Sequence, residues 1–347
     1  MKTTRKKSKT IISGLIVLAL LAIALLIYRD SLEEILRGIR EVSFPAILVS
    51  ALFSLLYFGL EGAIIYRMAA LYAPGYRPGY GIATAYRCEF YRLITFGNGA
   101  GIAEIHYLHR KGIERASAAG ISILQFVIKK VSVALLGSLG FLVLLSSAQT
   151  QELCRDYLGF LAAGCVITLL IVLALLAVIL SDAVMKAVLW LLDSIAVRFP
   201  AAGTKITALK EQVRLLNRSG RELFSRKAVL VQNILLNLVK FIAAYAIPAY
   251  LLYGKQALSP GECVALMAVV YMLAGVIPTP SGIGSLEFVY LLFFGSFAEP
   301  EVTVPSLLVF RFVTWILPFA VGGLFCLYDR IVPGGRSKNY EDKVMEN

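Results

Sequence analysis

Two short segments of this 347-residue chain combine glycine with a carboxylate at the same spacing. Glycine and proline interrupt helices, and in an apolar chain such interruptions are tolerated only where the backbone lines a polar cavity. A helix that begins after the interruption directs free N–H groups into the cavity and favours an anion, with a phosphate head group as the obvious candidate. The shared pattern is G-x-G-x-x-E: Gly99, Gly101 and Glu104 in the first segment, and Gly282, Gly284 and Glu287 in the second, which also contains Pro278 and Pro280.

Basic residues follow both segments at a similar distance. Lys129 lies 25 positions after Glu104, with Lys130 beside it, and Arg311 lies 24 positions after Glu287. Charged side chains within apolar stretches are costly and are functional candidates by default. We expect these cations and carboxylates to form a substrate site with the glycine-rich breaks. The other ionisable residues in apolar stretches are Glu61, Arg67, Arg87, Glu89, Arg92 and Lys240, of which Lys240 equally fits a packing role beside a carboxylate such as Glu61.

The composition shows what kind of element must position these residues. Hydrophobic residues make up 59% of the chain and charged residues 16%, and the mean hydropathy is +0.77. Soluble domains have less apolar and more charged sequence, so this chain is predicted to be an all-α integral membrane protein. The apolar runs long enough to span a membrane predict six helices, over residues 11–28, 44–72, 116–146, 157–180, 228–253 and 304–328.

Two further apolar stretches are too short to cross, and each leads into one of the glycine-rich segments. We predict two re-entrant broken hairpins, over 81–115 and 263–298, that enter from opposite sides as in inverted-repeat transporters. This topology places 22 Lys and Arg residues inside and five outside, the bias expected of cytoplasmic segments. It predicts a single membrane domain over 1–347 in the cell membrane, with a basic cytoplasmic N-terminus over 1–10 and a cytoplasmic tail over 329–347.

The segment 182–227 is predicted to be a basic amphipathic cytoplasmic loop. Ile206, Leu209, Val213 and Leu216 recur at helical spacing, opposite several Lys and Arg residues. Such helices lie on an anionic leaflet. The alternative is a solvated charged connector.

Other site types lack their usual residues. The five cysteines include no C-x-x-C pair, and His106 and His109 have no acidic companion at metal spacing, so neither a disulfide framework nor a metal site is expected. The G-x-G pattern lacks the strand context of a dinucleotide-binding loop. We therefore expect no cofactor. The net charge of +12 is attributed to topology and not to a nucleic-acid partner.

Three segments resemble the flippase-like transmembrane domain of the lysylphosphatidylglycerol synthetase family: 95–112 (TFGNGAGIAEIHYLHRKG), 275–287 (GVIPTPSGIGSLE) and the helix around Arg311. The resemblance covers nearly the whole chain. The matching positions are Pro278, Pro280, Gly282, Gly284, Glu287 and Arg311 in the second family motif, and Gly101 and Glu104 in the first. The chain departs from the family at Phe96, Gly97 and Asn98, where a motif beginning with proline is usual, and at Lys129 and Lys130, where an arginine and an acidic residue are common.

The resemblance implies a translocase that moves a phospholipid, an aminoacylated phospholipid or a lipid-linked phosphate between leaflets. The fused synthetases carry a soluble aminoacyl-transfer domain, whereas only about 19 residues follow Tyr328 here, so lysyl transfer by this chain alone is not expected. One alternative is a membrane subunit or scaffold for a separate lipid-modifying synthetase. Another is a membrane-embedded transferase with Glu104 or Glu287 as general base.

Overall fold

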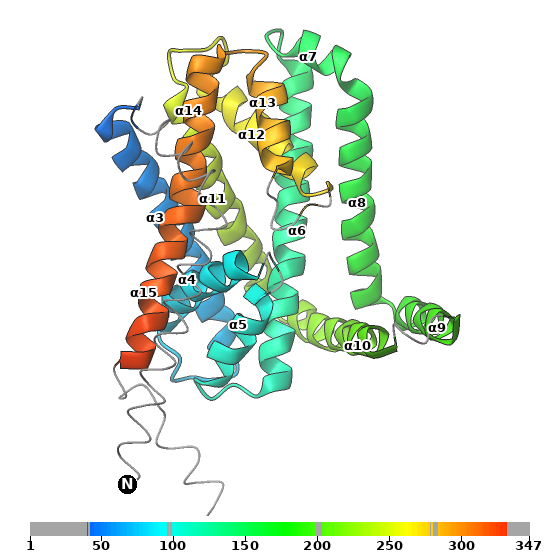
Figure 1. Ribbon diagram of the computed structural model, residues 1–347. Helices are drawn as coiled ribbons and strands as arrows, with labels where there is room; N and C mark the ends of the chain where they lie inside the picture. Colours follow the sequence, from blue (N-terminus) through cyan, green and yellow to red (C-terminus); the bar gives the residue numbers. More distant parts are fainter. Residues whose placement is uncertain are drawn as a thin grey trace, which may run out of the picture.

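The computed structural model describes residues 40, 42–95, 97, 99–198, 203–277, 279 and 284–331, and the regular structure within these ranges is helical. Five helical segments are long and apolar enough to cross a membrane (Figure 1). They correspond to five of the six predicted spans, and the sixth, over 11–28, lies outside the described residues. The five are α3 (Phe44–Ala69), α6 (Arg115–Ser146), α8 (Leu158–Leu180), α11 (Lys227–Leu251) and the continuous run of α14 (Pro300–Arg311), η3 (Phe312–Ile316) and α15 (Leu317–Ile331).

The last span begins at Pro300, four residues earlier than predicted. Proline suits the first turn of a helix because the N–H that it lacks has no partner there. The span is also not uniformly α-helical, since η3 is a π-helical turn directly after Arg311. Pro318, in the first turn of α15, has no N–H to donate to the preceding turn. The wider turn at η3 absorbs this loss.

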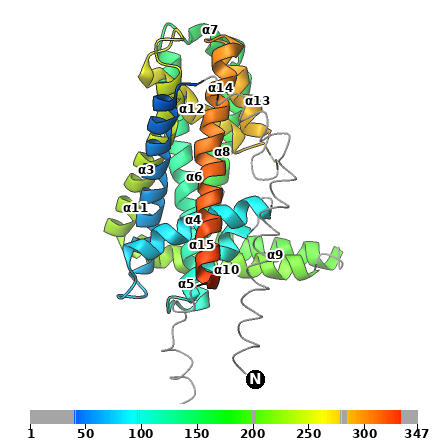
Figure 2. The ribbon, with the colours of Figure 1, turned by 60° about the vertical axis from the view of Figure 1, so that its left-hand side comes forward.

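Two pairs of shorter helices occupy opposite ends of the bundle (Figures 1 and 2). At the end where α9 and α10 lie, called the lower end here, α4 (Pro78–Ile94) packs against α5 (Gly99–His109). At the upper end α12 (Pro260–Ala274) packs against α13 (Ser285–Phe294). The short α7 (Gln151–Asp156) joins α6 to α8 at the upper end.

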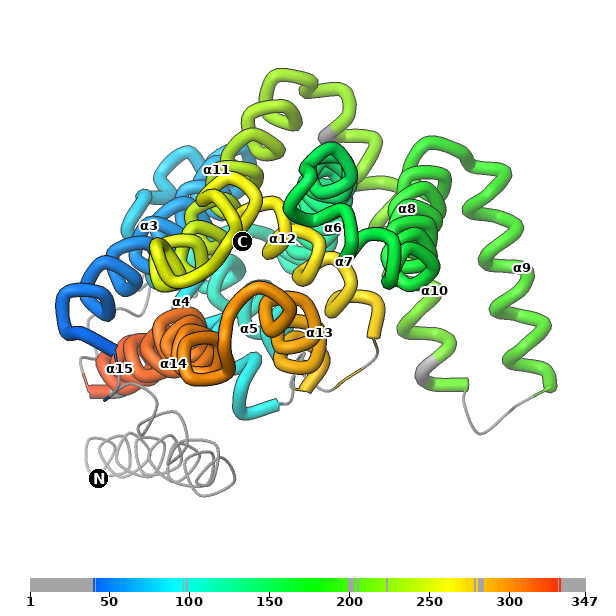
Figure 3. Tube along the Cα trace, turned by 90° about the horizontal axis from the view of Figure 1, so that it is seen from above, coloured from blue at the N-terminus to red at the C-terminus, as the bar shows by residue number. Residues whose placement is uncertain are grey.

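The segment predicted to be amphipathic forms two helices, α9 (Asp182–Arg198) and α10 (Gly203–Ser225), which lie across the lower end of the long helices. Leu216 on α10 is buried against Val178 and Ile179 of α8. The outer helix α9 packs against α8 and α10 at the edge of the molecule (Figure 3). Its Trp190 is 70% exposed.

Glycine allows α3, α4 and α15 to approach closely. A Cβ atom at Gly81 on α4 would lie 2.2 Å from the carbonyl oxygen of Gly62 on α3, and one at Gly322 on α15 would lie 2.2 Å from the carbonyl oxygen of Tyr86. Small residues at helix contacts are the usual means of tight packing in membranes, where burial of apolar surface gives little driving force. These contacts bring the polar residues of α3 and α4 together.

Candidate functional site

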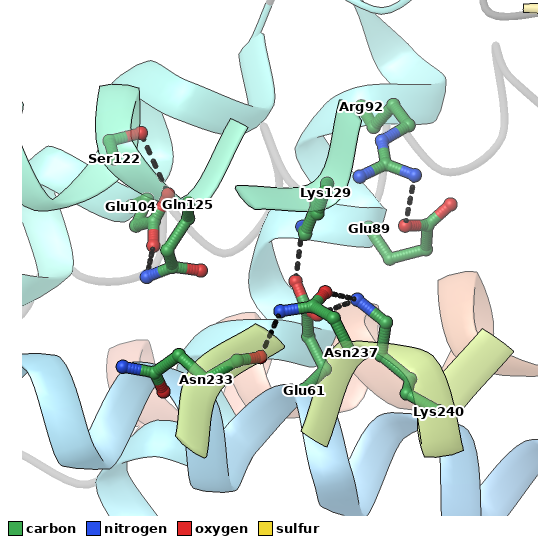
Figure 4. A network of polar contacts seen from close by, with 10 residues as sticks. All are labelled: Glu61, Glu89, Arg92, Glu104, Ser122, Gln125, Lys129, Asn233, Asn237 and Lys240. Carbon is green, nitrogen blue, oxygen red and sulfur yellow. Dashed lines mark hydrogen bonds and ion pairs between the residues drawn. The ribbon is translucent and has the colours of Figure 1, made fainter. Parts of the chain in front are cut away.

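A buried ion-paired cluster lies where α3, α6 and α11 meet (Figure 4). The carboxylate of Glu61 on α3 accepts from Lys129 of α6 and, at 2.8 Å, from Lys240 of α11. The Lys240 side chain has no solvent exposure, whereas that of Lys129 is 27% exposed. The structure thus confirms the contact between Lys240 and Glu61 that the sequence suggested. One carboxylate thus serves two ammonium groups, so that the three residues carry a net charge of +1.

Two asparagines continue this polar face along α11 toward the lower end. Lys240 also donates to the Oδ1 atom of Asn237 at 2.7 Å, and Asn237 Nδ2 donates to the backbone carbonyl of Asn233 at 2.9 Å. Asn233, Asn237 and Lys240 have 0% exposure. Their spacing of four and three residues places them on one face of the helix.

A second ion pair borders the cluster on α4. Arg92 Nη1 lies 3.0 Å from Glu89 Oε2, with Glu89 buried and the Arg92 side chain 36% exposed. Tyr57 of α3 and Tyr271 of α12 both pack against Phe241, the residue that follows Lys240. Tyr271 therefore brings the upper pair of helices to the edge of the cluster.

The first glycine-rich segment opens α5. The Gly99 N–H donates to Thr95 Oγ1 at 2.6 Å, and a Cβ at Gly99 would lie 2.5 Å from the same hydroxyl, so this position requires glycine. A Cβ at Gly101 would lie 3.4 Å from Ser122 Oγ. The first turn of α5 is therefore packed tightly against α4 and α6. Phe96 and Asn98 lie outside the described residues.

Glu104, the carboxylate of the first segment, is buried against α6. It accepts from Ser122 Oγ at 2.7 Å and from Gln125 Nε2 at 2.5 Å. Both of these partners are neutral, whereas Lys129, the cation that follows Glu104 in the sequence, is bonded to Glu61. Its partner Gln125 lies about one helical turn before Lys129 on α6, so Glu104 is near Lys129 without being the carboxylate that Lys129 contacts.

The second glycine-rich segment opens α13. Gly284 has φ +84°, a conformation that favours glycine. Its N–H donates to Glu287 Oε2 at 2.8 Å, while the other oxygen, Oε1, lies 2.6 Å from Arg311 Nε. Glu287 therefore both caps its helix and holds the cation 24 residues later. Pro278, Pro280 and Gly282 lie outside the described residues.

Arg311 sits at the end of α14, directly before the π-helical turn. Its side chain is 7% exposed, and its guanidinium lies 4.2 Å from the centre of the Trp315 ring. The ion pair with Glu287 and the cation–π contact fix the orientation of the guanidinium plane. π-Helical turns occur often at functional sites.

Lys130, the neighbour of Lys129, lies beside the end of α12. Its ammonium lies 5.7 Å from the centre of the Phe126 ring, and a Cβ at Gly275, the C-cap of α12, would lie 3.8 Å from it. No carboxylate among the described residues lies within ion-pair distance of it. Lys130 thus faces the end of α12, where the second glycine-rich segment begins.

The predicted site residues therefore form two groups. Lys129 belongs to the Glu61 cluster, with Glu104 close by, while Gly284, Glu287 and Arg311 lie together at the α13–α14 contact. The site prediction omitted Glu61, Arg92 and Lys240, although their charge within apolar stretches had marked them as functional candidates. Asn237 had no such signal, because a single amide in an apolar helix carries no charge.

The chain matches a known family of membrane regions over most of its length. The family described as "Lysylphosphatidylglycerol synthase TM region" matches residues 11–322, which is most of the chain and includes both glycine-rich segments and Arg311. No curated protein matches the chain. The matched family and the five apolar helices together indicate a multi-pass membrane protein involved in lipid modification or transport. The chain belongs to the lysylphosphatidylglycerol synthase TM region family.

Proposed function

We propose that this protein moves a phospholipid, an aminoacylated phospholipid or a lipid-linked phosphate between membrane leaflets. The observation that carries the proposal is the buried cluster of Glu61, Lys129 and Lys240 with the neighbouring Glu89–Arg92 pair. Charges within membrane-spanning helices are expensive and mark substrate pathways. A charged head group that crosses the bilayer needs a polar binding site within the hydrocarbon region to stabilise its charge.

The charges are arranged to receive an anion. The two most exposed side chains, Lys129 and Arg92, are cations, whereas their carboxylate partners Glu61 and Glu89 are 10% and 5% exposed. The five residues have a net charge of +1. A phosphodiester carries one negative charge at neutral pH and would neutralise the cluster, while hydrogen bonds from ammonium and guanidinium groups hold its oxygens. Among the three proposed cargoes, the cluster thus best suits a phospholipid with a monoanionic head group.

The two glycine-rich segments support a transport mechanism. We interpret α4–α5 and α12–α13 as re-entrant hairpins, which together form an inverted repeat around the cluster. Gly99, Gly101 and Glu104 would line one approach, and Lys130, Gly284, Glu287 and Arg311 the other, with Pro278, Pro280 and Gly282 completing the second break. Rocking of one hairpin against the other would expose the head group to each leaflet in turn.

The basic residues set the proposed orientation in the membrane. The lower end, with α9 and α10, would face the cytoplasm of a cell membrane, with both termini on this side. Lys210, Arg214, Arg218 and Arg221 lie on α10, and anionic lipids of the inner leaflet would attract them. A separate lipid-modifying synthetase is a further candidate partner at this surface.

The test is lipid movement by the purified protein in vesicles of phosphatidylcholine that contain fluorescent phosphatidylglycerol. Lys129→Met and Arg311→Ala should slow the movement about tenfold to a hundredfold, because a hydrogen bond to a charged group contributes about 1.5–3 kcal/mol. Lys255→Met is the matched control, since Lys255 lies exposed in the loop before α12.

The alternatives predict different results in the same preparation. Movement that is unchanged by both substitutions would remove the cluster and Arg311 from the mechanism. Absence of lipid movement, together with co-purification of a lipid-modifying enzyme, would favour a scaffold. Turnover of a labelled lipid-linked donor, lost on Glu104→Gln or Glu287→Gln, would favour a transferase.

A further inference from the structure

Asn233 is a buried amide whose side chain lacks partners in the described part of the protein. It has 0% exposure, and neither its Nδ2 nor its Oδ1 atom has a hydrogen-bond partner there. A buried amide left without partners is unfavourable, and buried polar groups that lack protein partners are normally satisfied by ordered water. Asn233 therefore has both a donor and an acceptor available to an ordered water molecule inside the helix bundle.

The amide lies between the ion-paired cluster and the lower end. Asn233 is seven residues, or about 10 Å along the helix, above Arg226, which precedes α11. In the other direction Asn237 separates it from Lys240 on the same face of the helix, and Asn237 bonds to both. Figure 4 shows the three side chains in this order along α11.

A small cavity lies near the start of α11, where the N-cap residue Arg226 lines it together with three other segments. Its polar lining residues are Tyr72, Glu222 and Arg226, and its volume for the centre of a water molecule is ≈ 10 Å³, about the space that one water needs. Burial and the Glu222 carboxylate raise the pKa of Tyr72 to about 12, so its hydroxyl stays protonated. The apolar lining residues are Met68 of α3, Leu71 in the turn after it, and Ile121 and Leu124 of α6; both helices also pack against α11.

We propose that ordered water at Asn233 connects this cavity to Lys240 and gives protons access to the buried ion pair. A proton would pass from water in the cavity to water at Asn233 and, past Asn237, to the Nζ atom of Lys240. Glu61 holds the resulting ammonium. The reverse movement leaves a neutral amine and returns the proton to water, so only N–H and O–H bonds form and break.

Charge balance links this path to the proposed function, on which the rest of the inference depends. With a monoanionic head group bound, the cluster is neutral when Lys240 is protonated. Without the head group, it is neutral when Lys240 has lost its proton. Head-group binding and proton uptake therefore favour each other. The charged and titratable groups that face Lys240 are Glu61 and Tyr57 of α3, Arg92 of α4 and Lys129 of α6. Tyr271 of α12 packs against Phe241, whose ring also contacts Lys240.

The experiment uses the full chain in vesicles of phosphatidylcholine and fluorescent phosphatidylglycerol, with a pH-sensitive dye inside. An imposed pH difference should drive lipid movement by the wild-type protein, with a matching change of internal pH. Asn233→Leu has a similar volume and no amide, and it should slow both about tenfold by removing the hydration site. Asn233→Ser, which keeps a hydroxyl and leaves room for water, should retain both.

Thr168→Val is the matched control. Thr168 of α8 is buried, and its hydroxyl also lacks a partner in the described part of the protein, but it lies on a different helix from the proposed path. It should behave as wild type. Asn233→Leu protein that folds and moves protons at the wild-type rate would overturn the path.

The two proposals fail differently. Lipid movement that is insensitive to pH and unaccompanied by internal pH change would overturn the proton path and leave the translocase standing. Internal pH change that is lost on Asn233→Leu, in vesicles where no lipid moves, would overturn the translocase and leave the path standing. Should Asn233→Leu not fold, the comparison of Asn233→Ser with wild type still decides, because loss of proton movement in the serine variant contradicts the water site.

Discussion

Lys240 donates to Glu61 across 179 residues of sequence, at 2.8 Å and with no exposure of the lysine side chain. The pair joins α11 to α3 inside the bundle, and Lys129 adds a third helix through the other oxygen of the same carboxylate. Removing one partner of a buried ion pair leaves an uncompensated charge, which is far more costly than removing both. The cluster therefore links the stability of the fold to the proposed function.

Glu61→Gln should destabilise the protein by about 3–5 kcal/mol, because Lys240 and Lys129 lose their shared counter-charge. Thermal unfolding in detergent measures the effect. The double variant Glu61→Gln/Lys240→Met should recover part of the loss, since it removes the buried ammonium as well. Glu211→Gln, at an exposed pair on α10, is the control. A Glu61→Gln protein as stable as the control would contradict the buried pair.

Gly81→Ala should cost about 1–3 kcal/mol, because the added Cβ would lie 2.2 Å from the backbone oxygen of Gly62. Gly59→Ala, also in a helix but with nothing within 4 Å of the added Cβ, should be neutral or stabilising by up to about 1 kcal/mol. Unfolding temperatures of the two variants provide the comparison. Equal effects of both substitutions would mean that α3 and α4 do not pack this closely.

Ser259→Ala should weaken the start of α12 by about 1 kcal/mol. Ser259 and Glu262 form a reciprocal capping box, with Ser259 N donating to Glu262 Oε2 at 2.8 Å. Ser296→Ala, which removes an exposed hydroxyl after α13, should have little effect. The order of unfolding temperatures tests the cap, and a larger loss for Ser296→Ala would contradict it.

The same cap predicts a dependence on pH. Hydrogen bonds from the hydroxyls of Ser147 and Ser259 hold the pKa of Glu262 below its usual value of 4.5. A carboxyl with a depressed pKa in the folded state contributes stability above its unfolded pKa and loses it as the pH falls through the folded value. Stability should therefore drop on acidification below about pH 4.5, and less so in Glu262→Gln, as followed by thermal unfolding. Parallel pH profiles for the two proteins would contradict the assignment.

Asp329→Asn should loosen the lower hairpin. Asp329 of α15 lies 2.8 Å from Arg87 of α4 and 3.8 Å from Arg110, which follows α5, and Arg87 also stacks on Tyr107. Loss of the shared carboxylate should raise hydrogen exchange across α4 and α5 and cost about 1–3 kcal/mol. The exposed Asp156→Asn in α7 provides the reference. Unchanged exchange across the hairpin would show that Asp329 does not hold it.

Much of this architecture follows from the sequence, because the length of an apolar run fixes whether a helix can cross a membrane. The amphipathic spacing of Ile206 and Leu216 likewise predicted a helix in α10. The pairing of Glu61 with Lys240 could not be assigned in the same way. Both residues were conspicuous as charges in apolar helices, but their contact depends on the relative height and rotation of α3 and α11. Those are set by packing over the whole interface.

The second glycine-rich segment illustrates the same limit. The sequence predicted that Gly284, Glu287 and Arg311 belong together, but not that Glu287 uses one oxygen for the cap and the other for the arginine. The π-helical turn after Arg311 had no clear signal either. It arises where a proline and packing against α3 act on the same stretch of helix.

That turn has a geometric consequence for the last helix. Arg311 and Asp329 are 18 residues apart, which at 3.6 residues per turn is about five full turns, so an uninterrupted α-helix would point both in the same direction. The π-helical turn inserts the equivalent of one residue and rotates the two parts by about 100° relative to each other. Arg311 therefore forms an ion pair with Glu287 at the start of α13, while Asp329 forms one with Arg87 of α4. Deleting one residue from 312–316 would remove the π-helical turn and keep this offset, because the two residues would then be 17 positions, or about 4.7 turns, apart in a regular α-helix.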